Sequence, residues 1–203
     1  MSNNHTPVPH KESAEPTLNW EKHLRWFAPL TAVILIAATA FMWMQGKSTS
    51  IRSEVLQAYA QATTADALVA VADAYPDQPE APLARLQAAA MQFNEGEFEK
   101  ALAEYEYFLL VFPSHAMANT AEWGSWMSQE AIGQLDEALA GFKSLTSTDL
   151  LYPQGLLGQA RIMEKKGQTE DALVIYQTIQ DEFSESNWAE QARVFAQRAK
   201  RTK

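Results

Sequence analysis

The chain has 203 residues, of which 47% are hydrophobic and 20% are charged, and its formal net charge is −9. This composition is typical of a folded protein and argues against an intrinsically disordered chain. The absence of cysteine excludes disulfides, thiolate metal sites and cysteine nucleophiles, and the acidic charge argues against nucleic acid as a partner, because it repels the phosphate backbone.

The charge is unevenly distributed along the chain. Residues 1–44 are neutral, residues 45–192 carry 8 basic against 22 acidic side chains, and residues 193–203 carry five basic side chains and no acid. Lys and Arg in the last turn of a helix stabilise the negative end of its dipole, which is the simpler interpretation of the basic terminus. Contact with anionic lipid is the alternative.

The N-terminal part of the sequence contains one long apolar segment. Residues 1–25 are rich in Pro, Ser and Asn and predict a disordered tail. Residues 26–44, WFAPLTAVILIAATAFMWM, follow without a charge and would form about 28 Å of helix, close to the thickness of the hydrocarbon core of a bilayer. Trp26 and Trp43 lie near its ends, where amphipathic rings favour the headgroup layer. The segment therefore predicts a single transmembrane helix.

Two other interpretations of this segment compete with a membrane span. A buried core helix normally has a polar stripe, and the polar residues available here are Thr31, Thr39 and the following Gln45. A cleaved signal peptide is compatible with the small residues Ala38 and Ala40, but cleavage there would leave Phe-Met-Trp-Met as the new terminus. An uncleaved anchor is the favoured prediction.

Basic residues near the segment indicate its orientation. Lys11, Lys22 and Arg25 precede it, whereas Lys47 and Arg52 follow it. By the positive-inside rule this difference favours a cytoplasmic N-terminus with the downstream domain exported. The acidic character of that domain is no obstacle, because long domains translocate largely regardless of charge.

A pattern of glycine, alanine and an aromatic residue then occurs three times, in GEFEKALAEY (96–105), GQLDEALAGF (133–142) and GQTEDALVIY (167–176). The alanines, five positions after each glycine, are separated by 37 and 34 residues, and 34 residues before the first of them stands Ala67. A period of 34 residues is typical of a helix–turn–helix solenoid. The aligned residues are Gly96, Gly133 and Gly167; Ala101, Ala138 and Ala172; and Tyr105, Phe142 and Tyr176.

Each residue of the pattern has a physical role. Glycine permits the left-handed conformation that ends a first helix and reverses the chain. Alanine allows two antiparallel helices to approach closely, and the aromatic ring one turn later fills the gap to the next repeat. Proline stops the second helix, as Pro113 is expected to do.

On these residues the chain resembles tetratricopeptide-repeat proteins over residues 48–186, with units at 48–81, 82–118, 119–152 and 153–186. The second unit matches best. The third departs from the pattern, with Trp126 where the family prefers a small residue and no proline at its end. The resemblance implies an all-α, right-handed solenoid of antiparallel helix pairs. The residues of the second unit on signature positions are Ala89, Gly96, Phe98, Ala101, Tyr105 and Pro113.

A capping helix is expected over residues 187–203, with Ser186 or Asn187 as its N-cap. Trp188, Ala192 and Phe195 share one face of this helix and would cover the last repeat.

The resemblance also implies a binding groove, because the first helices of tetratricopeptide units line a concave surface. Exposed aromatic and methionine side chains in such a groove suit a peptide-like partner. The alternative is that Phe93 and Trp123 pack against neighbouring helices. By register, the inward-facing residues would be Leu86, Ala90 and Phe93; Trp123, Met127 and Glu130; and Leu157, Arg161 and Glu164.

The sequence offers no catalytic constellation. His115 stands alone in a loop, and a lone loop histidine is more often solvated than a ligand or a base. The glutamates between residues 95 and 106 lack the spacing of a calcium loop and are interpreted as a solvated face. We therefore expect no enzymatic activity, no cofactor and no metal site.

A short N-terminal tail, one span and a divergent repeat domain in this order also resemble the ancillary subunit family of the bacterial SecYEG translocon. This resemblance implies the bacterial inner membrane, a periplasmic repeat domain, and secretion-translocon or periplasmic chaperone partners. The function expected is a membrane-tethered adaptor or scaffold that binds envelope proteins. The alternative is a structural assembly protein that self-associates through exposed Trp188 and Phe195; the oligomeric state itself is not predicted.

Overall fold

The structure is a computed structural model that describes the backbone of residues 20–201 and the side chains of residues 33–43 and 50–201. The chain divides into two compact units, Met1–Ile51 and Arg52–Lys203. The regular structure in the described residues is α-helical. The helices are α1 (Trp20–Gln61), α2 (Ala65–Ala74), α3 (Glu80–Asn94), α4 (Phe98–Val111), α5 (Ala118–Ala131), α6 (Leu135–Ser144), α7 (Tyr152–Lys165), α8 (Thr169–Glu182) and α9 (Asn187–Arg201).

Helix α1 differs from the predicted division of the N-terminal region. It begins at Trp20, so residues 20–25 are helical rather than part of a disordered tail, and residues 1–19 lie outside the described residues. It also continues without a break past residue 44 to Gln61. The reason is that WEKHLR (20–25) contains no helix breaker and that a single glycine, Gly46, costs a helix only about 1 kcal/mol.

The predicted transmembrane segment, residues 26–44, falls within α1. The side chains of residues 26–32 and 44 lie outside the described ones. Of the large apolar side chains between residues 33 and 43, all are exposed, with Ile36 at 68% and Trp43 at 72%. Among the residues that the structure describes, no helix is both long enough and apolar enough to cross a membrane.

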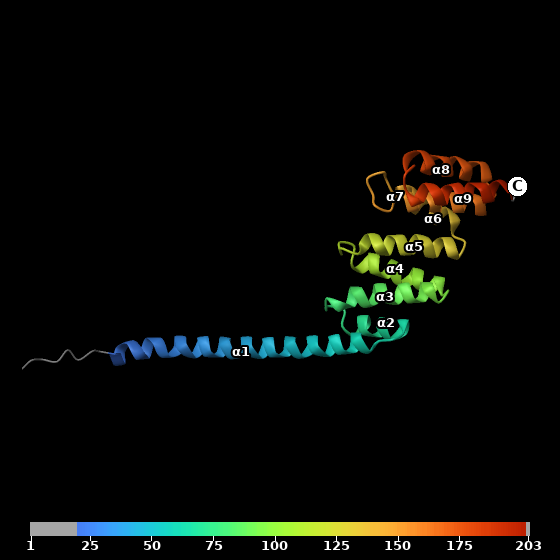
Figure 1. Cartoon of the computed structure of the whole chain (residues 1–203). Helices are drawn as coiled ribbons and strands as arrows, with labels where there is room; N and C mark the ends of the chain where they lie inside the picture. The colour runs from blue at the N-terminus through green and yellow to red at the C-terminus, as the bar shows by residue number, and fades with distance from the viewer. Residues whose placement is uncertain (1–19, 202–203) are drawn as a thin grey trace, which may run out of the picture. The chain divides into compact units, whose positions relative to one another are not determined.

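The second unit is a stack of helix pairs. Helices α3–α4, α5–α6 and α7–α8 form successive pairs, each helix packs against the next in sequence, and α9 packs on α8 and α7. The last residues of α1 belong to this unit with α2, since Val55 is buried and Tyr75 Oη donates to Glu54 Oε1 at 2.8 Å. The loops between pairs lie along one edge of the stack and the turns within pairs along the other (Figure 1). The predicted all-α array of helix pairs is confirmed.

The turn glycines adopt the predicted left-handed conformation, with φ of 82° at Gly96, 86° at Gly133 and 74° at Gly167. In each turn the amide after the glycine donates back across the helix end to a carbonyl five residues earlier. For example, Glu97 N donates to Gln92 O at 2.8 Å. These bonds are those of the Schellman motif, in which a residue without a β-carbon reverses the chain. The repeated glycine therefore sets the geometry inside each pair.

The repeated alanines and aromatics are buried. Ala101, Ala138 and Ala172 are each 0% exposed, as expected where two helices cross closely. The first pair differs from the prediction, since Leu68 is buried whereas Ala67 is half-buried. Its turn has no glycine, and α2 is capped instead by Thr64 Oγ1, which accepts from Ala67 N at 3.2 Å.

Helix α9 caps the last pair. Ser186 Oγ accepts from Trp188 N at 3.2 Å and from Ala189 N at 3.4 Å, so Ser186 is the N-cap. Ala192 is 0% exposed, and Trp188 and Phe195 pack against the core of the α7–α8 pair. Both aromatic side chains are half-buried against this core, so they do not form the fully exposed end that the self-association alternative assumed; self-association itself stays a prediction.

Candidate functional site

The predicted groove residues do not form one open surface. Leu86 is 8% exposed and Leu157 is 4% exposed, and each belongs to a hydrophobic core shared with the second helix of its own pair. These two residues must be reassigned from the groove to the core, because they face α4 and α8 rather than solvent. Ala90 is half-buried in α3.

The predicted aromatic groove residues also pack within the array. Phe93 is half-buried and its ring meets that of Phe98 edge to face, with centroids 5.1 Å apart. Trp123 is half-buried, and its ring lies 5.2 Å from that of Phe142. The alternative interpretation, in which these rings stabilise helix contacts, describes both residues.

The charged groove residues join successive first helices. Glu130 of α5 is 5% exposed and accepts from Arg161 Nε at 3.1 Å and Nη2 at 2.7 Å on α7. Lys165 Nζ lies 3.0 Å from Glu130 Oε1. Met127 lies beside this cluster, with its sulfur 3.6 Å from Arg161 Nη2. Burial alone would raise the pKa of Glu130, but the hydrogen bonds and charges of Arg161 and Lys165 outweigh it and lower the pKa.

Glu164 repeats this arrangement one pair later. It stands three residues before the turn glycine Gly167, as Glu130 does before Gly133. Its Oε2 binds Arg198 Nη2 of α9 at 2.8 Å, and its Oε1 accepts from Tyr176 Oη at 2.7 Å. Burial raises the pKa of Tyr176, and the hydrogen bond to Glu164 raises it further. The polar groove residues thus act as joints between pairs.

A cavity lies elsewhere, beside the shortened helix α6. This helix has 10 residues, whereas α4 and α8 have 14 each. It ends early because Ser144 Oγ donates to Gly141 O at 2.7 Å and because Thr146 donates from N and Oγ1 to Asp149 Oδ2 at 2.7 and 2.8 Å. Side chains that bond nearby backbone in this way compete with helix continuation. About one helical turn is therefore missing opposite the start of α5.

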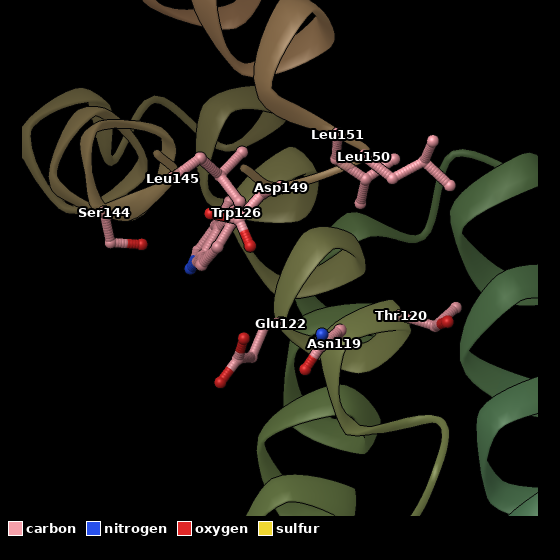
Figure 2. A pocket seen from close by; sticks show the side chains of 9 residues that line it. All are labelled: Asn119, Thr120, Glu122, Trp126, Ser144, Leu145, Asp149, Leu150 and Leu151. Atoms are coloured by element: carbon pink, nitrogen blue, oxygen red, sulfur yellow. The ribbon is translucent and has the colours of Figure 1, made fainter. Parts of the chain in front are cut away.

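The missing turn leaves a cavity of about 470 Å³ between the start of α5 and the α6–α7 loop (Figure 2). Its apolar lining comes from Trp126, Leu145 and Leu150, and Leu150 is 95% exposed. Its charged lining comes from Glu122 and Asp149, and the hydrogen bonds from Thr146 lower the pKa of Asp149. The cavity combines an apolar lining with carboxylates, which suits an apolar side chain next to a cation.

Trp126 lines this cavity because the third unit has a large residue where other units have a small one, and a glycine on the facing helix makes room for it. The seventh position before the turn glycine is Ala89 in the second unit and Ala160 in the fourth, whereas in the third it is Trp126. The indole lies over Gly141 of α6, where an added β-carbon would be 2.5 Å from Trp126 Cγ. Glycine at this position of α6 makes room for the indole.

Exposed apolar residues gather on the same edge as the cavity. They stand at the starts of first helices, at the ends of second helices and in the loops between pairs, which Figure 1 shows along one edge. The most exposed are Leu110 at 79% and Leu150 at 95%. The full set of large apolar residues exposed in these segments is Leu83, Leu110, Val111, Met117 and Leu150; this set is called the apolar edge below.

The sequence-based prediction missed the cavity and the apolar edge. Two features of the third unit could have indicated the cavity: the tryptophan at a position where the other units have a small residue, and the missing proline. Both departures contribute to the cavity, since Trp126 lines it and the proline-free LTSTD segment (145–149) replaces the last turn of α6.

Comparison with known proteins gives a consistent assignment of the fold. A tetratricopeptide-repeat family profile matches residues 154–186. No curated protein sequence matches this chain significantly. The chain is similar to crystal structures of nearly identical TPR-like repeats from a protein assigned as a kinesin light chain of Podosopora anserina, with a TM-score of 0.53, 16% identity, and coverage of 77% of this chain and 82% of that chain. A single-substitution variant of that protein gives a TM-score of 0.54 at the same identity and coverage.

These similarities identify the second unit as a TPR-like helical repeat array. Repeats of this kind generally serve as scaffolds for protein–protein interaction, because their stacking creates extended surfaces rather than one enclosed active site.

Proposed function

We propose that this protein is a membrane-tethered scaffold that binds a partner protein through the cavity beside Trp126. The single observation that supports this site best is the coincidence of the cavity with the apolar edge, since Leu150 belongs to both. Exposed apolar side chains beside a cavity that also carries carboxylates are a feature of interaction surfaces.

The proposed occupant is a partner segment with an apolar side chain next to a lysine or arginine. The indole of Trp126 and the side chain of Leu145 provide contact for the apolar group, and Glu122 and Asp149 provide charge complementarity to the cation. Tryptophan in a partly enclosed site is the kind of residue on which binding energy concentrates.

The proposed tether is the apolar part of α1. The exposed side chains from Val33 to Trp43 continue an uncharged sequence that begins at Trp26, and an α-helix that is apolar on all sides suits lipid better than water. In line with the architecture described from the sequence, we propose the bacterial inner membrane, a cytoplasmic N-terminus, a periplasmic repeat array, and translocon or chaperone components as partners.

The binding site is tested by photo-cross-linking in living cells. A photoreactive amino acid replaces Leu150 in one variant and Val174, which is 66% exposed on α8, in the other. We expect a defined partner to cross-link from position 150 and not from position 174. The purified partner should then bind the full chain with a Kd at least ~10-fold higher after Leu150→Asp or Glu122→Lys and unchanged after Val174→Asp. Equal cross-linking at both positions, or equal effects of the variants, contradicts the proposed site.

The tether is tested separately by fusing a reporter to the C-terminus. A reporter active only in the periplasm should be active in the full chain and inactive when residues 26–44 are deleted. Activity of a cytoplasm-specific reporter in the full chain would contradict the proposed orientation. Release of the full chain by alkaline extraction would contradict membrane insertion.

A further inference from the structure

A second cavity, of about 370 Å³, lies between α2 and the α3–α4 pair. It is lined by the second helices α2 and α4 and by Gln92 of α3, so it lies apart from the cavity beside Trp126. Its apolar lining comes from Val69, Ala70 and Ala103. The cavity therefore has walls suited to an aliphatic chain.

Gln92 is a buried polar residue without a complete set of partners. The residue lines the cavity and is only 3% exposed, and its Oε1 is buried without a hydrogen-bond partner. An unsatisfied buried polar group costs about 1–3 kcal/mol, so its presence beside a cavity points to a ligand that carries hydrogen-bond donors.

The charges around this cavity favour a cation. Asp66, Asp73 and Glu104 line it. The neighbouring Arg85 binds Asp73 and also binds Glu104, the latter at 2.6 Å. Its single positive charge holds these two carboxylates in place but does not neutralise the three acidic lining residues. Lys100 is the cation among the lining residues, and its ammonium group is bound to Glu97 at 2.8 Å.

The part of the array around this cavity also carries a negative net charge. Residues 52–131, which contain this cavity, carry 3 basic and 12 acidic side chains. Clefts lined by one sign of charge concentrate ligands of the opposite sign. A cation approaching this part of the array is therefore attracted before it reaches the cavity.

From these observations we infer that the cavity between α2, α3 and α4 binds a lysine or arginine side chain of a partner protein. The stem of the inserted side chain lies against Val69, Ala70 and Ala103, while its nitrogen donates toward the carboxylates and the amide of Gln92. This inference rests on the proposed scaffold function and adds a specificity pocket on the second-helix face, away from the first-helix surface expected from the sequence.

Titration of the full chain in detergent micelles with a short peptide, acetyl-Gly-Lys-Gly-amide, tests the pocket. The side-chain amide of Gln92, observed by NMR after ¹⁵N-glutamine labelling, reports binding. We expect its signal to shift and saturate with the lysine peptide and with the matching arginine peptide. The isosteric norleucine peptide should give no saturable shift. Equal shifts with norleucine, or the absence of saturation with all three peptides, would overturn the inference.

Matched charge variants locate the binding. Asp66→Asn removes an exposed carboxylate that lines the cavity, whereas Asp181→Asn makes the same change on α8. We expect the first to raise the Kd of the lysine peptide at least ~3-fold and the second to leave it unchanged. Equal weakening by both would assign the attraction to net charge and overturn the pocket. Tighter binding of free spermidine than of the lysine peptide would assign the cavity to polyamines and overturn a protein ligand.

This result is separable from the test of the cavity beside Trp126. Leu150→Asp should leave the binding of the lysine peptide unchanged, because Leu150 does not line the cavity between α2, α3 and α4. Loss of partner cross-linking at position 150 with retained peptide binding would count against the proposed function alone, and the reverse would count against the lysine pocket alone.

Discussion

The ring of Tyr105 occupies the space that a β-carbon on Gly124 would need. A β-carbon built on Gly124 would lie 2.5 Å from Cε1 of that ring. Tyr105 is on α4 and Gly124 is on α5, so this contact joins one helix pair to the next. Phe142 and Gly158 meet in the same way one pair later, where the β-carbon would lie 2.8 Å from Phe142 Cδ2.

We expect Gly124→Ala to destabilise the array. Alanine favours a helix over glycine by about 1 kcal/mol, but the buried Tyr105 ring cannot move away from the new methyl group without opening the contact between the pairs. Overpacking of this kind costs about 1–3 kcal/mol, so the expected net loss is at the lower end of that range. Equilibrium unfolding in urea measures it.

A double variant provides the control. Tyr105→Leu shortens the ring that meets Gly124, so Gly124→Ala should cost less in this background than in the natural sequence. The expected coupling is about 0.5–2 kcal/mol, as is usual for residues in contact. Additive effects of the two substitutions would show that the ring does not limit the space at Gly124.

The second prediction compares Ala101→Leu with Phe93→Ala. Ala101 is 0% exposed where α4 meets α3, so added methylenes must displace backbone, and we expect a loss of about 1–3 kcal/mol or more. Phe93 is half-buried and meets Phe98, so its truncation should cost less. Thermal melts of both variants check the order. An equal drop in Tm would show that Phe93 is a full member of the core.

The sequence predicted well what repeats within a pair. Gly96, Ala101 and Tyr105 stand at fixed spacings along the chain, and the backbone conformation and burial of each follow from its residue type. The groove prediction was less successful because the partners of a first helix lie on other repeats. Glu130, for example, binds Arg161, 31 residues further on, and the sequence does not show whether such a charge faces a partner helix or solvent.

Contacts between pairs carry a weaker sequence signal for the same reason. Gly124 and Gly158 are helical glycines, and without the opposing rings of Tyr105 and Phe142 they give no indication of their role. Trp126 was recognised as a departure from the repeat pattern, but its compensating partner, Gly141, lies on the other helix of the pair. The two residues of such an exchange can be matched to each other only from the three-dimensional structure.

The third prediction tests the exchange between Trp126 and Gly141. Trp126→Ala removes a half-buried ring and enlarges the cavity, so we expect a loss of stability below the ~3–5 kcal/mol typical of fully buried aromatic residues. Adding Gly141→Ile reproduces the pair found at the same positions of the fourth unit, Ala160 and Ile175. The double variant should be more stable than Trp126→Ala alone. Urea unfolding of both variants measures this difference. If adding Gly141→Ile restored none of the stability lost in Trp126→Ala, the proposed exchange would be contradicted.

The last prediction concerns acid stability. The folded chain lowers the pKa of Glu130 from its ordinary value of 4.5, since Arg161 and Lys165 outweigh the effect of burial. A carboxyl with a lowered folded pKa contributes stability above its unfolded pKa, and that contribution is lost as the pH falls through the folded value. We therefore expect Glu130→Gln to destabilise the array most at neutral pH, and this difference to shrink as the pH falls below 4.5.

Urea unfolding of the natural protein and the Glu130→Gln variant between about pH 7 and pH 3 measures this difference. Arg161→Met is the companion variant, because it removes the bidentate partner of Glu130 while leaving the carboxyl in place. In that background the residual effect of Glu130→Gln should be smaller at neutral pH, since only Lys165 still stabilises the charged form. A difference in stability between the natural protein and the Glu130→Gln variant that stays constant across the whole pH range would mean that the ion pair with Arg161 adds nothing to the joint between α5 and α7.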